Sequence, residues 1–411
     1  MRNLPFERTG ALESDLAFFK KYPSGDNPTK QPKEGHLPVA VYDINKIEET
    51  SNLKESLLAT SVAVVRNACK VFGLDTEKFK LDAVERINPE VLVEIVRQIP
   101  QPTSSNYHAR NTTRQTDEEK WVSFLHKHEV KITVLADFYR NVETLSKRTL
   151  EKIIDTPSEY QNLLRHLAQD MKTLQIPLPK NLSVDEDAFF TAFGTNVDIL
   201  NTDDYETLRE EIKKMPEFLQ PIGKNSFWAN IQDQLPGVNA VQIYYKVPGV
   251  RTFAHLENGC LASININLGG GECIWYSVPM EYSARLQQLV REKLRFRDDE
   301  TIFNLGFWPV LQCCLDAGIP IQKFTQKPGD MVVIGPGTYH WVQSNDITTH
   351  IAWNTARPTF IQLASIGISH DHYLSNKYTP MIPIESFIWS FAGRSGLRGD
   401  FVPLLKHFLC R

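Results

Sequence analysis

The sequence of 411 residues predicts an α+β protein, with an antiparallel β-sandwich or β-barrel core, a helical linker region before it and a short helical segment after it. Two observations predict this class. Between about residues 186 and 375, short runs rich in Val, Ile, Tyr, Trp and Thr alternate with Gly- and Pro-containing turns, which is typical of many short antiparallel strands. Before residue 185, longer segments carry apolar residues at helical spacing.

The N-terminal zone, residues 1–185, is expected to consist of helices and linkers. Apolar spacing favours helices over four segments: 53–74, 89–99, 130–155 and 158–174. Within the first of them, residues 61–68 fit a short strand equally well. The segment 100–119 is polar and rich in Pro, Ser, Thr and Asn, which is loop composition.

The central zone, residues 186–375, carries the expected strands. They are NAVQIYYKV, CLASININL, CIWYSV, IQKFTQ, MVVIGP, YHWVQS and HIAWNT, separated by the turns PGV, LGGGE, KPGD and GPG. A helix over residues 281–296 and the segment 307–320 interrupt the strands. The last zone, 376–411, contains FVPLLKHFLC, which predicts a short helix that caps the barrel.

Composition excludes several classes of function. The chain is 42% hydrophobic and 23% charged, and its formal net charge of -4 gives no overall attraction to nucleic acid or anionic lipid. No run approaches the roughly 18 apolar residues of a membrane span. The six cysteines include no C-x-x-C pair and the first residues lack a leader pattern, so a reducing compartment, cytosol or nucleus, is expected.

The segment YKVPGVRTFAHLENGC, residues 245–260, suggests a metal site. Side chains two apart on a strand point to the same face, so His255 and Glu257 should project together. His340, just after a Gly-Pro-Gly turn, is the best candidate for a third ligand, because a closed sheet brings distant strands together. Two histidines and one carboxylate leave three metal positions open, the arrangement of non-haem Fe(II) oxygenases.

Polar residues around this segment suggest a co-substrate. Lys246 precedes and Thr252 follows a Pro-Gly turn, so a hairpin is expected to bring ammonium and hydroxyl close to the metal. Ser263 and Asn265 share one face of an alternating strand, and Asn267 continues that row. Polar groups that face a barrel interior need a ligand or partner, because burying them unpaired costs about 1–3 kcal/mol each. The set suits a dicarboxylate.

Other histidines are expected to be bystanders. Solvated side chains are predicted in two polar groups, His370–Asp371–His372 and His126–His128–Glu129. His407 and Cys410 have helical spacing, but no second Cys pair accompanies them, so they are interpreted as terminal helix residues rather than a zinc site. The three glycines at 269–271 make a turn and lack the pattern of a phosphate loop.

Three stretches carry a resemblance to a known family: VQIYYKVPGVRTFAHLENGCLASININLGGGECIWY, PGDMVVIGPGTYHWVQ and HIAWNTARP. They closely resemble the JmjC domain of the UTX-type histone demethylases, which act on trimethylated and dimethylated lysine 27 of histone H3. The similarity extends upstream through FGTNVDI and, more weakly, to about residue 40. It implies a double-stranded β-helix of the jelly-roll or cupin type, and an Fe(II)- and 2-oxoglutarate-dependent dioxygenase that uses O2 to demethylate lysine.

The resemblance also implies roles for single residues and partners. By position, the iron ligands are His255, Glu257 and His340; the 2-oxoglutarate-binding residues are Lys246, Thr252 and Asn265, with Ser263 beside them. Tyr244 matches a residue close to the methyl-lysine. The implied partner is the histone H3 tail, with proteins of chromatin complexes beside it, and the implied location is the nucleus. Neither a membrane nor a nucleic-acid site is expected.

Five positions depart from the family pattern: Phe253, Ala254, Leu256, Gly259 and His350. The first two stand where the family usually has Pro-Gly. His350 replaces an asparagine, and its bulkier ring is expected to alter the co-substrate pocket. The last residue, Arg411, precedes the place of the cysteine-rich zinc module that follows the JmjC domain in relatives, so altered histone selectivity is expected.

Three alternatives remain beside the demethylase. The first is an oxygenase that hydroxylates or demethylates a different protein target. The same predicted metal ligands support it. The second is a chromatin scaffold with weak or no catalysis, against which the intact ligands and Lys246 argue. The third is a cupin-like metal protein without 2-oxoglutarate, for which neither Lys246 nor Thr252 would be needed.

Overall fold

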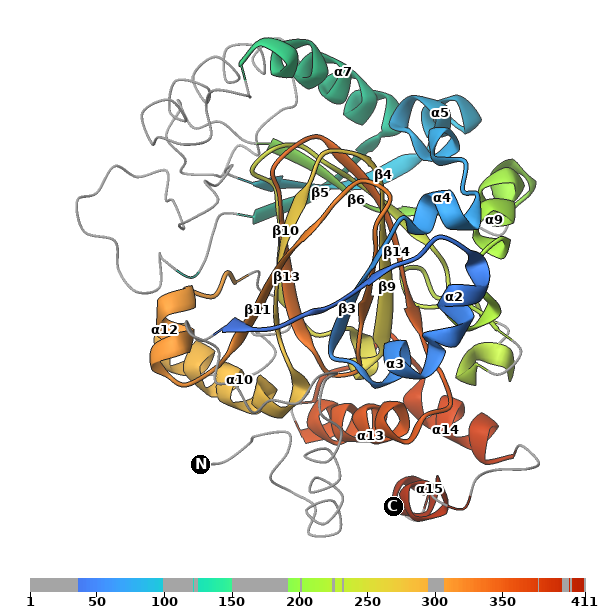
Figure 1. Ribbon diagram of the computed structural model, residues 1–411, viewed down its shortest axis with the longest axis vertical. Coiled ribbons are helices and arrows are strands. Elements are labelled where there is room, and N and C mark those ends of the chain that lie inside the picture. The colour runs from blue at the N-terminus through green and yellow to red at the C-terminus, as the bar shows by residue number, and fades with distance from the viewer. Residues whose placement is uncertain are drawn as a thin grey trace.

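The computed structural model describes residues 36–98, 121, 125–149, 191–199, 202–223, 226–230, 233–294, 307–375, 377–393, 399 and 401–409. Two β-sheets form its centre and helices lie around them (Figure 1). The helix expected over residues 158–174 and the loop expected over 100–119 lie outside the described residues.

The smaller sheet has five strands in the order β1-β11-β10-β13-β8. These strands are β1 (His36–Leu37), β8 (Arg251–His255), β10 (Cys273–Val278), β11 (Ile321–Gln326) and β13 (Tyr339–Ser344). Strand β1 runs parallel to β11, and the other neighbours are antiparallel. The strands expected at CIWYSV, IQKFTQ and YHWVQS are confirmed.

The larger sheet has nine strands in the order β2-β3-β12-β9-β14-β7-β6-β4-β5. They are β2 (Ala40–Asp43), β3 (Val62–Arg66), β4 (Leu92–Gln98), β5 (Leu125–Lys131), β6 (Thr191–Asp198), β7 (Gln242–Lys246), β9 (Ala262–Gly270), β12 (Met331–Ile334) and β14 (Thr348–Thr355). Only β2 and β3 pair in parallel among the described strands of this sheet. The four expected strands that correspond to β7, β9, β12 and β14 are confirmed.

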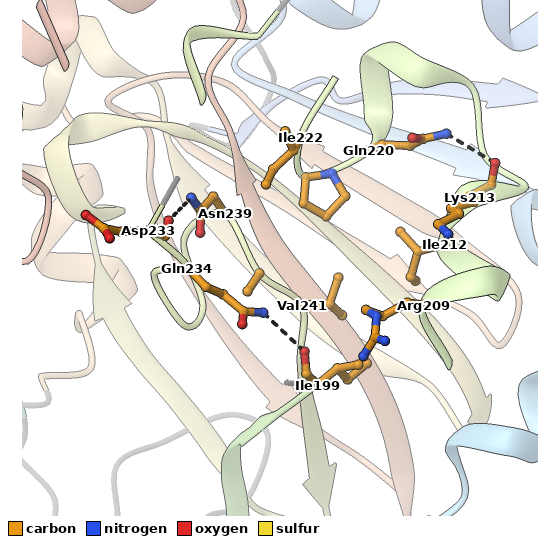
Figure 2. Close-up of a pocket in the computed structure, with 12 residues that line it drawn as sticks. Ile199, Arg209, Ile212, Lys213, Gln220, Ile222, Asp233, Gln234, Asn239 and Val241 are labelled. Carbon is orange, nitrogen blue, oxygen red and sulfur yellow. Dashed lines mark hydrogen bonds between the residues drawn. The ribbon is translucent and has the colours of Figure 1, made fainter. Parts of the chain in front are cut away.

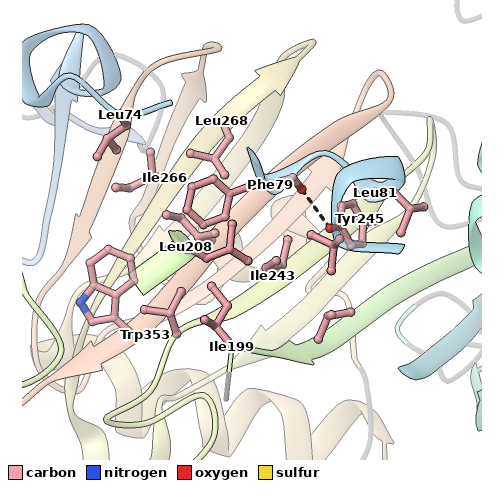
Figure 3. Close-up of a cluster of buried hydrophobic side chains, with 14 of the residues drawn as sticks. Leu74, Phe79, Leu81, Ile199, Leu208, Ile243, Tyr245, Ile266, Leu268 and Trp353 are labelled. Atoms are coloured by element: carbon pink, nitrogen blue, oxygen red, sulfur yellow. Dashed lines mark hydrogen bonds between the residues drawn. The ribbon is translucent and has the colours of Figure 1, made fainter. Parts of the chain in front are cut away.

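Apolar side chains from both sheets pack between them. This inner cluster contains Val62, Val64, Cys273, Trp275, Val332, Ile334 and Val342, which come from β3, β10, β12 and β13. A larger cluster covers the outer face of the nine-stranded sheet, where Tyr245 donates a hydrogen bond of 2.9 Å to the Phe79 carbonyl (Figure 3). Two sheets packed over a shared apolar layer form the predicted jelly-roll core.

Helices cover the larger sheet on its outer side (Figure 1). The helices before the central strands are α2 (Ile47–Asn52), α3 (Lys54–Ala59), α4 (Ala68–Phe72), α5 (Leu81–Ile87), α7 (Ile132–Thr149) and α9 (Glu206–Lys213). Single 3₁₀ turns are η1 (Thr76–Phe79), η3 (Asp203–Tyr205), η4 (Glu217–Leu219), η5 (Phe227–Asn230) and η6 (Asn258–Cys260). Helix α7 confirms the helical part of the segment 130–155 that the structure describes.

Two groups of helices complete the fold. Helices α10 (Met280–Leu294) and α12 (Leu311–Asp316) pack against the five-stranded sheet through a cluster that includes Leu286 and Trp341. Helices α13 (Phe360–Ser375), α14 (Ile384–Ala392) and α15 (Phe401–Leu409) close one end of the sandwich (Figure 1). The expected C-terminal helix is confirmed as α15. Within the described residues, no helix has the length and apolar character needed to span a bilayer.

One expected helix is wrong. The segment 89–99 contains β4, which pairs with β5 on one side and β6 on the other. Its run of Val and Ile fits both a buried helix and a strand, and long-range pairing decides for the strand. The strand alternative for residues 61–68 is correct, because β3 lies there. The strands before and after residue 185 share one sheet, and the domain boundaries near 185 and 375 stay a prediction.

Candidate metal centre and co-substrate pocket

Two strands of the smaller sheet position two histidines. His255 is the last residue of β8, and His340 on β13 lies directly opposite it in the antiparallel register. Their ring centroids are 4.3 Å apart with an interplanar angle of 55°. From the next strand, β10, the indole of Trp275 stacks on His340 at 5.9 Å and 16°. The sheet register therefore brings together two side chains that are distant along the chain.

Glu257 completes the group. Strand β8 ends before it, but its extended backbone, with φ -62° and ψ 152°, keeps its side chain beside that of His255. The distance from Glu257 Oε1 to His340 Nε2 is 3.4 Å. Ligand atoms of His255, Glu257 and His340 all lie within 4.8 Å of one another, close enough for one ion to bind all three. The structure thus brings the predicted ligands together.

Backbone carbonyls orient both imidazoles. His255 Nδ1 lies 2.7 Å from the Phe253 carbonyl oxygen, and His340 Nδ1 lies 3.1 Å from the Thr338 carbonyl oxygen. A carbonyl only accepts hydrogen bonds, so Nδ1 carries the proton in each ring. The Nε2 lone pairs are consequently available to a metal. Metal-binding histidines generally hold their other ring nitrogen in this way.

The electrostatics of the group also favour a cation. Burial and the nearby His340 lower the pKa of His255 to about 4, so its imidazole is neutral near pH 7. Burial alone would raise the pKa of Glu257, but its close contact with His340, and more weakly with His255, outweighs burial and lowers that pKa to about 2. A neutral imidazole and an ionised carboxylate are the forms in which these side chains bind metals.

An irregularity in β8 turns Thr252 toward the same interior. His255 pairs with His340 and Thr252 pairs with Val342, so three steps on β8 match two steps on β13. The extra residue lets Thr252 and His255 share a face although their spacing is odd. Val342 belongs to the inner cluster, which places that face between the two sheets.

Lys246 is a buried cation near the metal ligands. Its side chain is 3% exposed, and its ammonium lies 5.3 Å from the ring centre of Phe193. Among the described residues it forms no ion pair or hydrogen bond, and burial lowers its pKa. Burying an unpaired ammonium is costly, so an anionic ligand would stabilise this site.

The expected hairpin between Lys246 and Thr252 is wrong. Strand β7 lies in the nine-stranded sheet and β8 in the five-stranded sheet, so the Pro-Gly segment crosses from one sheet to the other. The crossing closes with a hydrogen bond of 3.1 Å from the Val250 amide to the Val247 carbonyl. The ammonium and the hydroxyl therefore reach the interior from opposite sheets, which suits a ligand held between the two layers.

The polar row on β9 is present in part. Ser263 is 5% exposed, and the Asn265 carbonyl oxygen Oδ1 lies 2.9 Å from His350 Nδ1. Asn267 lies opposite His350 in the register of β9 and β14, but its side chain forms its hydrogen bonds elsewhere. The Asn267 amide instead donates to the Gly271 carbonyl and accepts from the Gly269 amide, at 2.9 and 3.0 Å. Asn267 therefore shapes the glycine turn rather than the pocket.

Comparison with protein families matches this part of the chain. Residues 242–355, which include all three proposed metal ligands, match the family model described as JmjC domain, hydroxylase. This chain contains a JmjC domain. The recognition made from the sequence motifs is therefore confirmed at the level of the domain, together with its jelly-roll fold.

Known proteins with similar sequences are lysine demethylases. The chain is 28% identical over 359 residues to lysine-specific demethylase jmjd-3.1 of Caenorhabditis elegans, covering 87% of this chain and 32% of that protein. It is 27% identical over 333 residues to human lysine-specific demethylase 6B, covering 80% of this chain and 19% of that protein. Lysine-specific demethylase REF6 of Arabidopsis thaliana is 27% identical over 177 residues, which cover 41% of this chain and 13% of REF6. The chain spans a third or less of each relative's length.

Tyr244 is the residue predicted to lie close to the methyl-lysine. It sits on β7 opposite His350, and its hydroxyl donates to Gln242 Oε1 at 2.9 Å. Gln242 in turn donates to Asp198 Oδ1 at 2.7 Å. Burial and the charge of Glu257 raise the pKa of Tyr244, so the phenol stays protonated beside the metal ligands.

Most departures from the family pattern point away from the JmjC metal ligands. The centres of the Phe253 and Trp308 rings are 6.4 Å apart. Ala254 and Leu256 belong, with Trp308, to the cluster that includes Leu286 and Trp341. Gly259 has a φ of 62°, which suits glycine, and its backbone amide donates a hydrogen bond of 3.0 Å to the Tyr373 hydroxyl. His350 is the exception, because its ring lies in the pocket wall beside Asn265.

Several pocket residues were not predicted. Trp275, Gln326, Cys273 and Thr348 surround the row that contains Asn265 and His350, and each is at most 2% exposed. Thr348 lies opposite Lys246 in the register of β14 and β7. Gln326 and Thr348 are polar residues within strands β11 and β14. A polar residue at an inward strand position is the sequence signal that could have identified them as part of the site.

The other histidines do not join the metal group within the described residues. His370 lies on α13 with its Nε2 3.8 Å from Glu385 Oε1, and His372 is buried in the same helix rather than solvated as expected. His126 and His128 lie on β5, where helical or loop structure was expected. The side chain of His407 and the residue Cys410 lie outside the described part of the chain.

A separate cavity of about 320 Å³ lies between α9 and the start of β7 (Figure 2). Ile199, Ile212, Ile222 and Val241 form its apolar wall. None of its lining residues belongs to the group of His255, Glu257 and His340. The cavity is therefore distinct from the candidate metal centre.

Proposed function

We propose that this chain is an Fe(II)- and 2-oxoglutarate-dependent dioxygenase that removes methyl groups from a histone lysine, with trimethylated and dimethylated lysine 27 of histone H3 as substrate. One observation carries the proposal. A group of two histidines and one glutamate lies in the interior of a JmjC domain, and near it lies the buried ammonium of Lys246, which has no ion pair or hydrogen bond among the described residues. A metal centre together with an unpaired cation suits a co-substrate that chelates iron and carries a second carboxylate.

The residues present fit Fe(II). Both imidazoles present Nε2 and keep Nδ1 hydrogen-bonded to the backbone, and Glu257 supplies an anionic oxygen. Such a set occupies three positions and leaves three open. When bound, iron and 2-oxoglutarate supply the activation of dioxygen that oxidises the methyl C–H bond, with succinate, carbon dioxide, formaldehyde and demethylated lysine as products.

The chain's own residues bind and orient the co-substrate. Lys246 would bind the distal carboxylate from one sheet, and Thr252 would donate its hydroxyl from the other. Asn265 and Ser263 line β9 between them. A charge-assisted hydrogen bond in a buried site is stronger than one in water, so Lys246 should dominate this affinity.

The proposed substrate is a methylated lysine of a protein tail. The relatives are lysine-specific demethylases, and Tyr244, Gln242 and Asp198 form a hydrogen-bonded chain beside Glu257. An aromatic ring and a carboxylate suit a methylammonium group, which is cationic and partly apolar. Action in the nucleus and partners in chromatin complexes follow from a histone substrate and belong to the same proposal.

The test is mass spectrometry of a panel of methylated histone H3 peptides incubated with the protein, Fe(II), ascorbate and 2-oxoglutarate. Loss of methyl groups from lysine 27, coupled to succinate, is the expected result. Turnover of 2-oxoglutarate with demethylation at another lysine would reject the assigned target. Absence of both products with every peptide would reject the demethylase.

A second candidate is a hydroxylase that acts on a different protein. The description of the matching family as a hydroxylase favours it. The same mass spectrometry separates the two, because hydroxylation adds an oxygen to the peptide and demethylation removes methyl carbon.

A further inference from the structure

His350 belongs to a row of hydrogen-bonded side chains that connects the two sheets. The ring is fully buried, with Nδ1 2.9 Å from Asn265 Oδ1 and Nε2 3.3 Å from Cys273 Sγ. Asn265 also contacts Gln326, whose Oε1 accepts a hydrogen bond of 2.8 Å from Trp275 Nε1. The row joins β9 and β14 of the nine-stranded sheet to β10 and β11 of the five-stranded sheet.

The direction of each hydrogen bond in this row follows from groups that can only donate or only accept. The indole of Trp275 can only donate, so the Gln326 atom facing it is the carbonyl oxygen. The Gln326 nitrogen then faces two backbone carbonyls, those of Asn265 and Asp330, which can only accept. Both neighbours therefore fix the same orientation of the Gln326 amide.

The orientation of Asn265 follows in turn. Gln326 Nε2 has two N–H groups and three acceptors, so one N–H is shared between the backbone carbonyl of Asn265 and its side-chain Oδ1, which lies 3.2 Å away. The same oxygen lies 2.9 Å from His350 Nδ1, which must then carry the ring proton. His350 Nε2 is left as an acceptor for the Cys273 thiol. Asn265 Nδ2 has no hydrogen-bond partner among the described residues.

We propose that His350 is a positioning residue for the co-substrate: its Nδ1–H and the Gln326 amide hold Asn265 Oδ1 against the pocket wall, so that Asn265 Nδ2 is presented to 2-oxoglutarate. This inference rests on the proposed function and adds a residue to it. Two donors on one oxygen leave the asparagine a single orientation. A freely turning amide would present its oxygen to the co-substrate carboxylate for part of the time, which is repulsive.

The place of His350 agrees with this role. It lies two residues after Thr348, which is opposite Lys246, and it is itself opposite Tyr244. Side chains two apart on a strand share a face, so His350 faces the same interior as Lys246. Burial, with the charge of Lys246, lowers the pKa of His350 and keeps the ring neutral, as the single-proton arrangement requires.

The row also reaches the metal ligands. Trp275, which begins the series of donors, stacks on His340 at 5.9 Å. One indole thus touches a proposed ligand with its face and orients the Gln326 amide with its N–H. The metal centre and the asparagine that holds the co-substrate are positioned by the same side chain.

A nucleophilic role for Cys273 and His350 is excluded by their surroundings. Thiol, imidazole and asparagine follow one another in the order used by some cysteine hydrolases. Both side chains are 0% exposed, and burial raises the pKa of the thiol. A reactive cysteine needs a lowered thiol pKa and access to substrate, so Cys273 is not a nucleophile.

Two substitutions separate the functions of the two ring nitrogens. His350→Asn places an amide nitrogen near the position of Nδ1 and can still donate to Asn265. His350→Gln places its amide near the position of Nε2, where it can meet Cys273 but not Asn265. Both are neutral and smaller than histidine, so they form a matched pair.

Binding of 2-oxoglutarate to the Mn(II)-loaded full chain, measured by calorimetry without oxygen, is the primary readout. The dissociation constant should rise about tenfold in His350→Gln and stay within about threefold of wild type in His350→Asn, as expected for one orienting hydrogen bond. The affinity for Mn(II) alone should be unchanged in both. Equal weakening in the two variants, weakening in neither, or a parallel loss of Mn(II) binding would overturn the role of Nδ1.

Failure of the proposed function has a different result. If the wild-type chain with Mn(II) does not bind 2-oxoglutarate, the co-substrate assignment itself fails and the role of His350 falls with it. If the wild type binds and the variants do not differ, only the present inference fails.

The ring proton can be located without any ligand. Long-range ¹⁵N NMR of histidine-labelled wild-type protein, with His350 assigned by loss of its signals in His350→Gln or His350→Asn, should show Nδ1 protonated and Nε2 unprotonated. The opposite tautomer would overturn the donor direction on which the inference depends, even if one variant does not fold.

Discussion

His255 and His340 face each other across one antiparallel strand pair, with ring centroids 4.3 Å apart, although most of the JmjC domain separates them in sequence. Each ring holds its Nδ1 against a backbone carbonyl two residues earlier. The orientation of both rings is therefore set by the strands themselves, before any ion binds. This preorganisation is what a metal centre formed by these residues would require.

Replacing His255 by alanine should abolish metal-dependent chemistry. We expect Mn(II) binding to weaken by more than about 100-fold, because even groups that only orient a ligand contribute about 10- to 100-fold. Succinate formation with a methylated histone H3 peptide should be lost. Calorimetry with Mn(II) and a succinate assay measure the two effects.

His370→Ala is the matched control for that variant. This histidine lies on α13, and its nearest acidic partner, Glu385, is exposed. Metal binding and turnover should remain at the level of the parent protein. Equal activity in His255→Ala and His370→Ala would remove His255 from the catalytic centre.

Replacing Lys246 by methionine should have opposite effects on binding and on stability. The loss of a charge-assisted hydrogen bond, typically 1.5–3 kcal/mol, should weaken 2-oxoglutarate binding by about 10- to 150-fold and leave Mn(II) affinity nearly unchanged. Without ligand, the variant should be at least as stable as the parent, because it lacks a buried ammonium that has no ion pair or hydrogen bond within the described part of the chain. Calorimetry and urea unfolding measure both. A less stable variant, or an equal loss of Mn(II) and 2-oxoglutarate affinity, would contradict the assigned role.

Local sequence patterns were sufficient to predict the central strands and to bring the three ligands together as candidates. The alternation in CIWYSV and YHWVQS, and the two-residue spacing of His255 and Glu257, are local properties that survive in the fold. The identification of His340 needed the assumption of a closed core, which two packed sheets fulfil.

Long-range pairing accounts for what the sequence did not predict. The segment of β4 reads LVEIVRQ, whose short apolar run does not distinguish a strand from a buried helix, and pairing with β5 and β6 at its two edges decides for the strand. The Pro-Gly segment after Lys246 looks like a hairpin turn, but it connects two sheets. The row from Trp275 to His350 draws on separate strands, so no local motif could contain it.

The stability contribution of Glu211 should depend on pH. This carboxylate on α9 accepts hydrogen bonds from the Asp75 amide at 2.8 Å and from Lys78 and Lys214 at 2.5 Å, and its side chain is 1% exposed. Burial would raise its pKa, but these donors outweigh burial and lower the pKa from 4.5 to about 2. The unfolded chain then binds more protons between these values, so the stabilisation is complete above about pH 4.5 and is lost as the pH falls toward 2.

We expect Glu211→Gln to cost about 2 kcal/mol at pH 7, reduced from the sum of its hydrogen bonds because both lysines are partly exposed to solvent. Urea unfolding of the metal-free chain at pH 7 and at pH 3.5 should show the difference from the parent shrinking at the lower pH. Glu210→Gln removes an exposed ion pair with Lys213 on the same helix and should change stability little at either pH. A pH-independent difference for Glu211→Gln would show that its charge does not contribute.

Gly270→Ala should destabilise the chain far more than Gly73→Ala, although both glycines have a left-handed φ, of 92° and 65°. A Cβ at Gly270 would lie 1.8 Å from the Ile347 carbonyl oxygen, beside the pairing of Thr348 on β14, whereas a Cβ at Gly73 would meet nothing within 4 Å. Left-handed strain alone costs about 1–2 kcal/mol, which is the expected effect at Gly73. At Gly270 the backbone must also move, which adds about 1–3 kcal/mol. Urea unfolding of both variants measures the difference in the free energy of unfolding. Equal decreases would mean that the turn between β9 and β10 changes its conformation without disturbing β14.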